Sequence, residues 1–308
     1  MTCVGIDVAK DTLACACQGQ VKEFSNSQKG LQELDSWALG ARTWCMEPTG
    51  RYHELAANYA HKSGKTCFVV NPARAKKYLG FVDGRAKTDK VDALALQRLA
   101  ERESDSLRPF TPPSPMSLKA RDLVVERRAV VESRVSLELV VSQTGDPGGH
   151  LAEATAALRK SEKELGKELL LLLNEHPSYQ LLQTIPGIGP MSASLLVLAL
   201  ELGDFPTSDS LVAFAGLDPK ASDSGQKRGR RKLSHQGNAE LRSVLFMASR
   251  SASRHAHWAP YYQRHKDNGR ASTEATVILA RKILRTAWSV YKNNKPFETM
   301  SQGLANKP

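Results

Sequence analysis

Residues 4–10 read VGIDVAK, and this stretch decides the fold of the first third of the chain. A short apolar run that ends in a single carboxylate predicts a buried β-strand carrying Asp7. A buried carboxylate without a partner is costly, so Asp7 needs an arginine or a metal ion beside it.

Three further carboxylates follow the same pattern. Glu47 ends a second apolar run, in residues 44–50 (WCMEPTG), while Asp89 and Asp92 lie in residues 87–93 (KTDKVDA). Asp89 and Asp92 are three residues apart in a predicted helix and therefore share one face. Carboxylates from two strand ends and one helix face can converge on Mg²⁺, which prefers oxygen ligands and bridges phosphates. The four acids therefore predict a magnesium site and phosphodiester chemistry.

The order of elements in residues 1–108 predicts an α/β fold. Three strands come first, then helix, strand, helix, strand and helix, over residues 2–8, 12–17, 21–24, 29–39, 42–46, 52–63, 65–70 and 88–102. A meander followed by βα alternation is typical of a ribonuclease-H-like (RuvC-like) domain. This fold would place Asp7 in the middle of the sheet, Glu47 on the neighbouring strand and the other two acids on the last helix.

The region 109–177 predicts a linker and a helical hairpin. It opens on a proline-rich joint, RPFTPPSP at 108–115, which precedes helical stretches at about 116–142 and 151–175. The break between them, TGDPGG at 144–149, contains turn residues. We expect an antiparallel coiled coil that acts as a spacer or an oligomerisation arm rather than in chemistry.

Residues 178–293 predict a mainly helical domain that opens on a helix-hairpin-helix. The turn reads LQTIPGIGP at 182–190 and precedes an apolar helix over 191–202. Gly187 and Gly189 would let the backbone approach a phosphate, which the second helix's free N–H groups would bind. The alternative is an ordinary tight turn between two helices. The tail, 294–308, is predicted to be disordered.

A basic loop at residues 222–232 (SDSGQKRGRRK) indicates a nucleic-acid contact, although a solvated loop is the alternative. The net charge of the chain is +11, and residues 181–308 carry 18 Lys and Arg against 9 Asp and Glu. A polyanion partner explains such an uneven distribution. The residues expected to contact phosphates are Lys227, Arg228, Arg230, Arg231 and Lys232, with Arg242 on the following helix, 238–253.

The composition excludes a membrane protein and a disulfide scaffold. The longest apolar run, 195–202, is too short to span a bilayer, and the start of the chain lacks a signal-peptide core. The five cysteines are odd in number, fall within the first 67 residues and form no CxxC pair, which predicts reduced core residues. We expect a cytoplasmic protein without a membrane partner.

The order of these motifs resembles that of a known family. GIDVAK (5–10), EPTG (47–50), KTDKVDA (87–93), IPGIG (185–189), AGLDP (215–219), SG (224–225) and QGN (236–238) follow one another along the chain. The chain resembles the DEDD transposases of bacterial insertion sequences, which include Piv-type DNA invertases and bridge-RNA-guided recombinases. The resemblance extends over residues 2–290. At residues 223–226 the chain reads DSGQ, where relatives often carry a second glycine.

The resemblance implies a RuvC-like domain, a coiled coil and a transposase domain, with Mg²⁺ bound by Asp7, Glu47, Asp89 and Asp92. It implies a catalytic serine that links covalently to DNA; Ser224 matches best, with Ser222 and Ser234 as alternatives. It also implies donor and target DNA chosen by an element-encoded guide (bridge) RNA, and a homo-oligomer, dimer or tetramer, whose active site is completed in trans.

Two other hypotheses stay open from the residues themselves. A junction resolvase would use the same carboxylates with water as the nucleophile, and a covalent protein–DNA species distinguishes it from a recombinase. A nucleic-acid-binding protein with a degenerate fold would show no metal-dependent activity. The intact set of four acids argues against this last reading.

Overall fold

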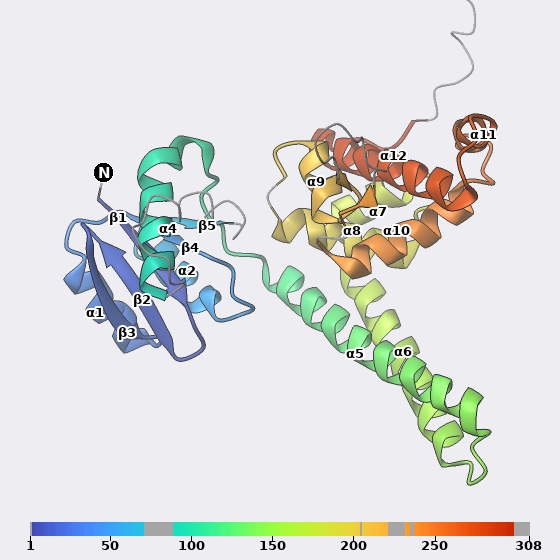
Figure 1. Ribbon diagram of the computed structural model, residues 1–308, viewed down its shortest axis with the longest axis horizontal. Coiled ribbons are helices and arrows are strands. Elements are labelled where there is room, and N and C mark those ends of the chain that lie inside the picture. The colour runs from blue at the N-terminus through green and yellow to red at the C-terminus, as the bar shows by residue number, and fades with distance from the viewer. Residues whose placement is uncertain (1, 71–88, 204, 221–231, 235–236, 299–308) are drawn as a thin grey trace, which may run out of the picture. The chain divides into compact units, whose positions relative to one another are not determined.

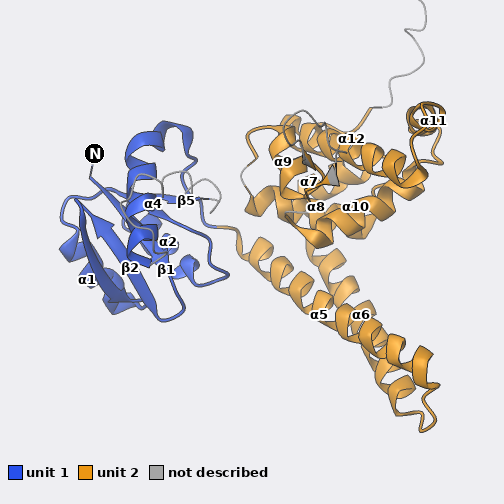
Figure 2. Ribbon diagram, viewed as in Figure 1, with its two compact units in different colours: residues 1–112 blue, residues 113–308 orange. Residues whose placement is uncertain are grey.

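The computed structural model describes residues 2–70, 89–203, 205–220, 232–234 and 237–298. The chain divides into two compact units, residues 1–112 and 113–308 (Figure 2). The helical hairpin belongs to the second unit.

Unit 1 is built on a five-stranded sheet of order β3-β2-β1-β4-β5 (Figure 1). Strands β1 (Cys3–Val8), β2 (Thr12–Cys17) and β3 (Gln20–Ser25) form an antiparallel meander. Strands β4 (Thr43–Met46) and β5 (Thr66–Val69) run parallel to β1. The predicted α/β character is confirmed, and this mixed sheet is consistent with a ribonuclease-H-like domain.

Helices cover both faces of the sheet. Helices α1 (Gln28–Trp37) and α2 (His53–Lys62) bury the face that carries Ile6, Trp44 and Met46. Helix α4 (Asp89–Glu103) packs on the opposite face, where Cys3, Cys45 and Phe68 meet Leu96, Leu99 and Ala100. All five cysteines are buried, which confirms their predicted place in the core. A short 3-10 turn, Ser104–Ser106, follows α4.

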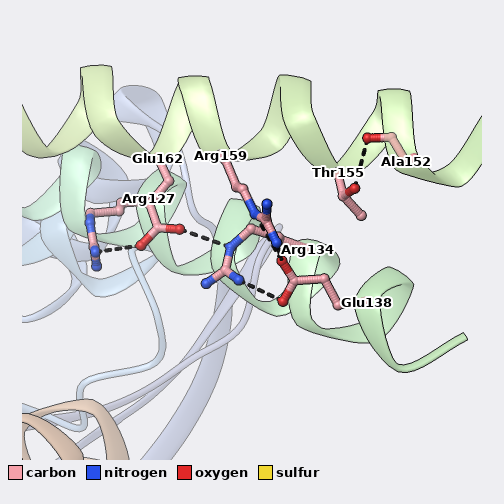
Figure 3. Close-up of polar contacts among 7 residues, drawn as sticks. All are labelled: Arg127, Arg134, Glu138, Ala152, Thr155, Arg159 and Glu162. Atoms are coloured by element: carbon pink, nitrogen blue, oxygen red, sulfur yellow. Dashed lines mark hydrogen bonds and ion pairs between the residues drawn. The ribbon is translucent and has the colours of Figure 1, made fainter. Parts of the chain in front are cut away.

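Unit 2 begins with the predicted hairpin, formed by α5 (Pro115–Thr144) and α6 (His150–Leu173). Ser114 caps the start of α5, and Gly145 ends it in the left-handed conformation that glycine adopts freely. Arginines and glutamates join the two helices: Glu162 on α6 accepts from Arg127 (2.8 Å) and Arg134 (2.9 Å) on α5, and Arg159 donates to Glu138 (2.7 Å) (Figure 3).

The rest of unit 2 is a helical body around one apolar core, which includes Leu196, Leu245 and Ile283. Its helices are α7 (Pro177–Gln183), α8 (Pro190–Leu202), α9 (Ser208–Phe214), α10 (Ala239–Ala252), α11 (Ala259–Asp267) and α12 (Ser272–Asn293). A two-stranded ribbon joins β6 (Pro219–Lys220) and β7 (Lys232–Leu233). No helix in the described part of the chain could cross a membrane.

The segment 294–298 differs from the expected disordered tail. The N–H of Phe297 donates to Thr184 Oγ1 (2.7 Å), and its ring stacks on Trp258 with centroids 5.8 Å apart. An aromatic side chain that packs on a folded surface orders the chain around it. The remainder of the predicted tail, 299–308, lies outside the described residues.

Candidate active site and nucleic-acid interface

Asp7 and Glu47 lie at the same edge of the sheet, where the neighbouring parallel strands β1 and β4 reach their C-terminal ends. The parallel pairing of β1 with β4 runs from Cys3 opposite Thr43 to Ile6 opposite Met46, so the next residues in this register are Asp7 and Glu47. Side chains alternate along a strand, so Asp7 projects to the same face as Gly5, and Glu47 to the same face as Cys45. Both carboxylates are half-buried, and neither lacks an interaction partner.

Helix α4 covers that face and points its first turn towards the same edge. Cys3 packs with Leu99 and Ala100, whereas a Cβ added to Gly5 would meet Ala93 O at 2.0 Å and Gln97 N at 2.3 Å. The helix therefore runs antiparallel to β1. Its first turn, with the exposed Asp89 and the half-buried Asp92, extends towards the Asp7 end of the strand.

The donor chemistry of these four acids suits a hard divalent cation, since all their ligand atoms are carboxylate oxygens. Within the described residues, however, no three His, Cys, Asp or Glu side chains are close enough together to hold a metal ion. The fold thus brings Asp7 and Glu47 to one edge and directs α4 towards it, without closing the set of ligands.

The predicted helix-hairpin-helix turn joins α7 to α8. Gly187 has φ +93°, and a Cβ there would come within 2.5 Å of Ala252 Cβ on α10. The indole Nε1 of Trp258 donates to Pro186 O (2.9 Å). Packing against α10 therefore explains why residue 187 is a glycine. At Gly189 an added Cβ would have no neighbouring atom within 4 Å, so the start of α8 is accessible.

The serine loop lies largely outside the described residues. Ser222, Ser224, Lys227, Arg228, Arg230 and Arg231 all fall in that part, and of Lys232 only the backbone is described. Pro219 pairs with Leu233 and Lys220 with Lys232, on either side of the loop. Next to this ribbon, Ser234 Oγ donates to the Asp218 carboxylate, and its N–H donates to Asp218 O (2.9 Å). The hydroxyl of Ser234, one of the alternative nucleophiles, is therefore engaged by a carboxylate.

Arg242, a predicted phosphate contact, makes a contact within the protein. Its guanidinium donates to Ala215 O (3.1 Å), and the side chain is half-buried. Asn238, which precedes it, caps α10 by accepting from Leu241 N (2.9 Å). Arg242 thus ties the start of α10 to the residues before Asp218.

Comparison with known proteins identifies the family of this chain. A model described as "Transposase IS116/IS110/IS902 family" matches residues 179–263, and a second transposase model, of the DEDD type of IS110, matches residues 4–143. The chain belongs to the IS110-type transposases. It is 29% identical to the pilin gene-inverting protein of Moraxella bovis, over 96% of this chain and 98% of that one. It is 27% identical to the transposase for insertion sequence element IS1328 of Yersinia enterocolitica, over 94% and 96%.

This IS110-type transposase is therefore a DNA transposase or recombinase, and DNA is its partner. Its carboxylates fall within the stretch matched by the DEDD-type model, and such a domain suggests a divalent metal. The helix-hairpin-helix turn, the ribbon and Arg242 fall within the stretch matched by the other model.

Proposed function

We propose that this transposase cuts and rejoins DNA strands with Mg²⁺ held by Asp7, Glu47, Asp89 and Asp92, and with Ser224 as the nucleophile. The observation that carries the metal proposal is the shared edge: Asp7 and Glu47 continue one parallel register, and α4 directs its two acids towards it. When bound, the metal would orient the scissile phosphate and stabilise the leaving oxygen.

The acids repel one another when no cation neutralises them, which favours a separated arrangement. Metal binding should therefore draw the first turn of α4 and the edge of the sheet together. Asp92→Asn should raise the thermal midpoint without metal, and should reduce the increase in midpoint that Mg²⁺ gives the wild type, because a ligand stabilises only the state that binds it. Full activity with Mg²⁺ in both Asp89→Ala and Asp92→Ala would place the site elsewhere.

Ser224 supplies the covalent step in this proposal. Its Oγ forms a bond to phosphorus, the P–O bond to one deoxyribose breaks, and the proton that the serine loses is matched by one that the leaving oxygen gains. Rejoining reverses these exchanges with a new strand. A serine hydroxyl is a poor nucleophile without a base or a metal nearby, which links the serine to the carboxylates.

The position of the two groups in the chain supports an active site assembled in trans. The carboxylates belong to unit 1 and the serine loop to unit 2, with the α5–α6 hairpin following the boundary between them. A homo-oligomer, dimer or tetramer, would place one subunit's serine beside the metal of another. Mixing Asp7→Ala subunits with Ser224→Ala subunits should then restore activity that neither has alone.

The nucleic-acid contacts proposed for unit 2 are to phosphates. Gly187 and Gly189 lie in the hairpin turn, and the loop cations Lys227, Arg228, Arg230, Arg231 and Lys232 supply the charge together with Arg242. Such contacts serve both donor and target DNA and a bridge RNA from the element, which would select the DNA sites. This function would place the protein in the cytoplasm, at the nucleoid. Sequencing RNA that co-purifies with the protein tests the guide.

A trapped protein–DNA adduct tests the mechanism. Wild type should give an adduct on denaturing gels with Mg²⁺, and Ser224→Ala should abolish it, whereas Ser222→Ala and Ser234→Ala should retain it. An adduct that persists in Ser224→Ala would overturn the assignment. Cleavage without any adduct would favour a resolvase that uses water.

A further inference from the structure

One face of α12 lines a groove that the proposed function does not use. Lys282, Arg285, Thr286, Ser289 and Asn293 recur at helical spacing, beside the buried face of the helix, which includes Leu279, Ile283 and Ala287. The segment 295–298 forms the other wall. The groove has a volume of about 590 Å³, which lies in the range of small-molecule pockets.

The wall formed by 295–298 is fixed by contacts far away in the sequence. Phe297 donates its N–H to Thr184 Oγ1 at the end of α7, and Trp258, which stacks on Phe297, donates to Pro186 O. The His257 ring also packs against Phe297 in a T-shaped pair, with centroids 5.0 Å apart. The aromatic side of the groove is therefore anchored beside the helix-hairpin-helix turn.

The groove is positively charged. Lys282 and Lys295 are exposed and, among the described residues, neither has a carboxylate within 4.0 Å. Arg285 differs, because it pairs with Asp209 (2.8 Å), and Glu298 is the acid in the lining. The pKa of His257 is lowered by burial and then by His255 and Lys282, which agrees with a positive local potential.

Cations, neutral hydrogen-bonding groups and an aromatic ring in one groove match what single-stranded nucleic acids require. Lysines attract the backbone, a ring accepts a stacked base, and hydroxyl and amide groups meet base edges. A duplex is too wide for a pocket of this volume, whereas one or two unpaired nucleotides would fill it. We propose that the groove between α12 and residues 295–298 binds an unpaired segment of nucleic acid, with Lys282 and Lys295 on the backbone and Phe297 under a base.

The test measures binding of the full chain to a fluorescent 12-nucleotide oligomer without Mg²⁺, so it depends on neither the carboxylates nor Ser224. Changing Lys282→Gln and Lys295→Gln together should reduce the slope of log K against log salt by about 1.4, at roughly 0.7 per phosphate contact on a single strand. Phe297→Leu should weaken binding about tenfold with the slope unchanged.

The matched control is Lys160→Gln with Lys163→Gln, two exposed lysines on α6 that remove the same charge away from the groove. This pair should leave the slope near that of wild type. An equal change of the slope in the two pairs would mean that only net charge matters and would overturn the proposal. A larger loss of affinity for duplex than for single strands would also overturn it.

DNA and RNA oligomers of one sequence distinguish the two sources of the ligand. If the glutamine pair binds the DNA oligomer, the RNA oligomer or both more weakly than wild type does, the groove is supported, and the larger loss of affinity shows which nucleic acid it binds. Unchanged affinity for both oligomers would refute the proposal. If the glutamine pair lowers the thermal midpoint more than the control pair does, the variant Lys282→Arg with Lys295→Arg separates the loss of charge from a loss of stability. That pair keeps the charge and should restore the slope.

Discussion

Gly5→Ala tests the close contact between β1 and α4 that sets the direction of the helix. A Cβ at residue 5 would lie 2.0 Å from Ala93 O, and an ordinary contact is 3.4 Å, so α4 or β1 must move by about 1.4 Å. Both partners are backbone or held by backbone, so no side-chain rotation relieves the clash. Overpacking of this kind costs about 1–3 kcal/mol, which the lower entropy of the unfolded alanine chain offsets by about 0.5–1 kcal/mol.

The same shift should impair catalysis. It moves Asp89 and Asp92 relative to Asp7, and in the proposed mechanism, in which these acids hold the metal, a displacement of about 1 Å reduces the rate about 10²-fold. Urea unfolding would measure the free energy of unfolding, a strand-transfer assay the rate, and the Mg²⁺-induced increase in thermal midpoint the metal affinity. We expect all three to fall.

Gly166→Ala is the control. Gly166 lies inside α6, and its added Cβ would meet Arg127 Nε and Met191 Cε at 3.8 Å, an ordinary contact. Alanine there should stabilise the protein by about 1 kcal/mol and leave strand transfer unchanged. Wild-type stability and activity in Gly5→Ala would refute the packing of α4 on β1 described above.

Three further outcomes are expected. Trp258→Phe keeps a ring but removes the donor to Pro186 O, and should lower the free energy of unfolding in urea by about 1 kcal/mol; no change would mean that the bond adds nothing. Glu162→Gln weakens the acceptor shared by Arg127 and Arg134, which are both largely covered, and should lower the free energy of unfolding by about 1–2 kcal/mol. The exposed Glu132→Gln should lower it by less than half of that amount. The pKa of His257 is lowered in the folded state, so the unfolded chain binds the proton more readily and stability falls as the pH drops below about 6.5. His257→Gln should show a smaller loss of thermal midpoint between pH 7.5 and 5.5 than wild type, and an equal loss would exclude this residue as its source.

Local patterns were sufficient for the sheet and for the elements that hold the carboxylates. Apolar runs that end in Asp7 and Glu47 predict strands, and the βα alternation after the meander restricts how those strands can pair. The spacing of Asp89 and Asp92 fixes a shared helix face in the same way. Short elements were missed, since α9, α11 and the two-residue strands β6 and β7 are too brief for a periodic signal.

The reasons behind particular residues depend on contacts that the sequence does not reveal. Gly187 leaves space that Ala252 fills, and Arg242 bonds Ala215 O, and no local pattern predicts either contact. No sequence pattern marks Gly5, because the need for a glycine there arises only when α4 packs on β1.

By itself the sequence determined which strands and which helix hold Asp7, Glu47, Asp89 and Asp92, because strand and helix periods are local properties of the chain. The tertiary structure decided which of them meet. The register of β4 beside β1 sets Glu47 next to Asp7, and the close approach at Gly5 sets the direction of α4. The groove on α12 exists only because Phe297 reaches Thr184 and Trp258, and contacts between such distant residues depend on packing rather than on any local pattern.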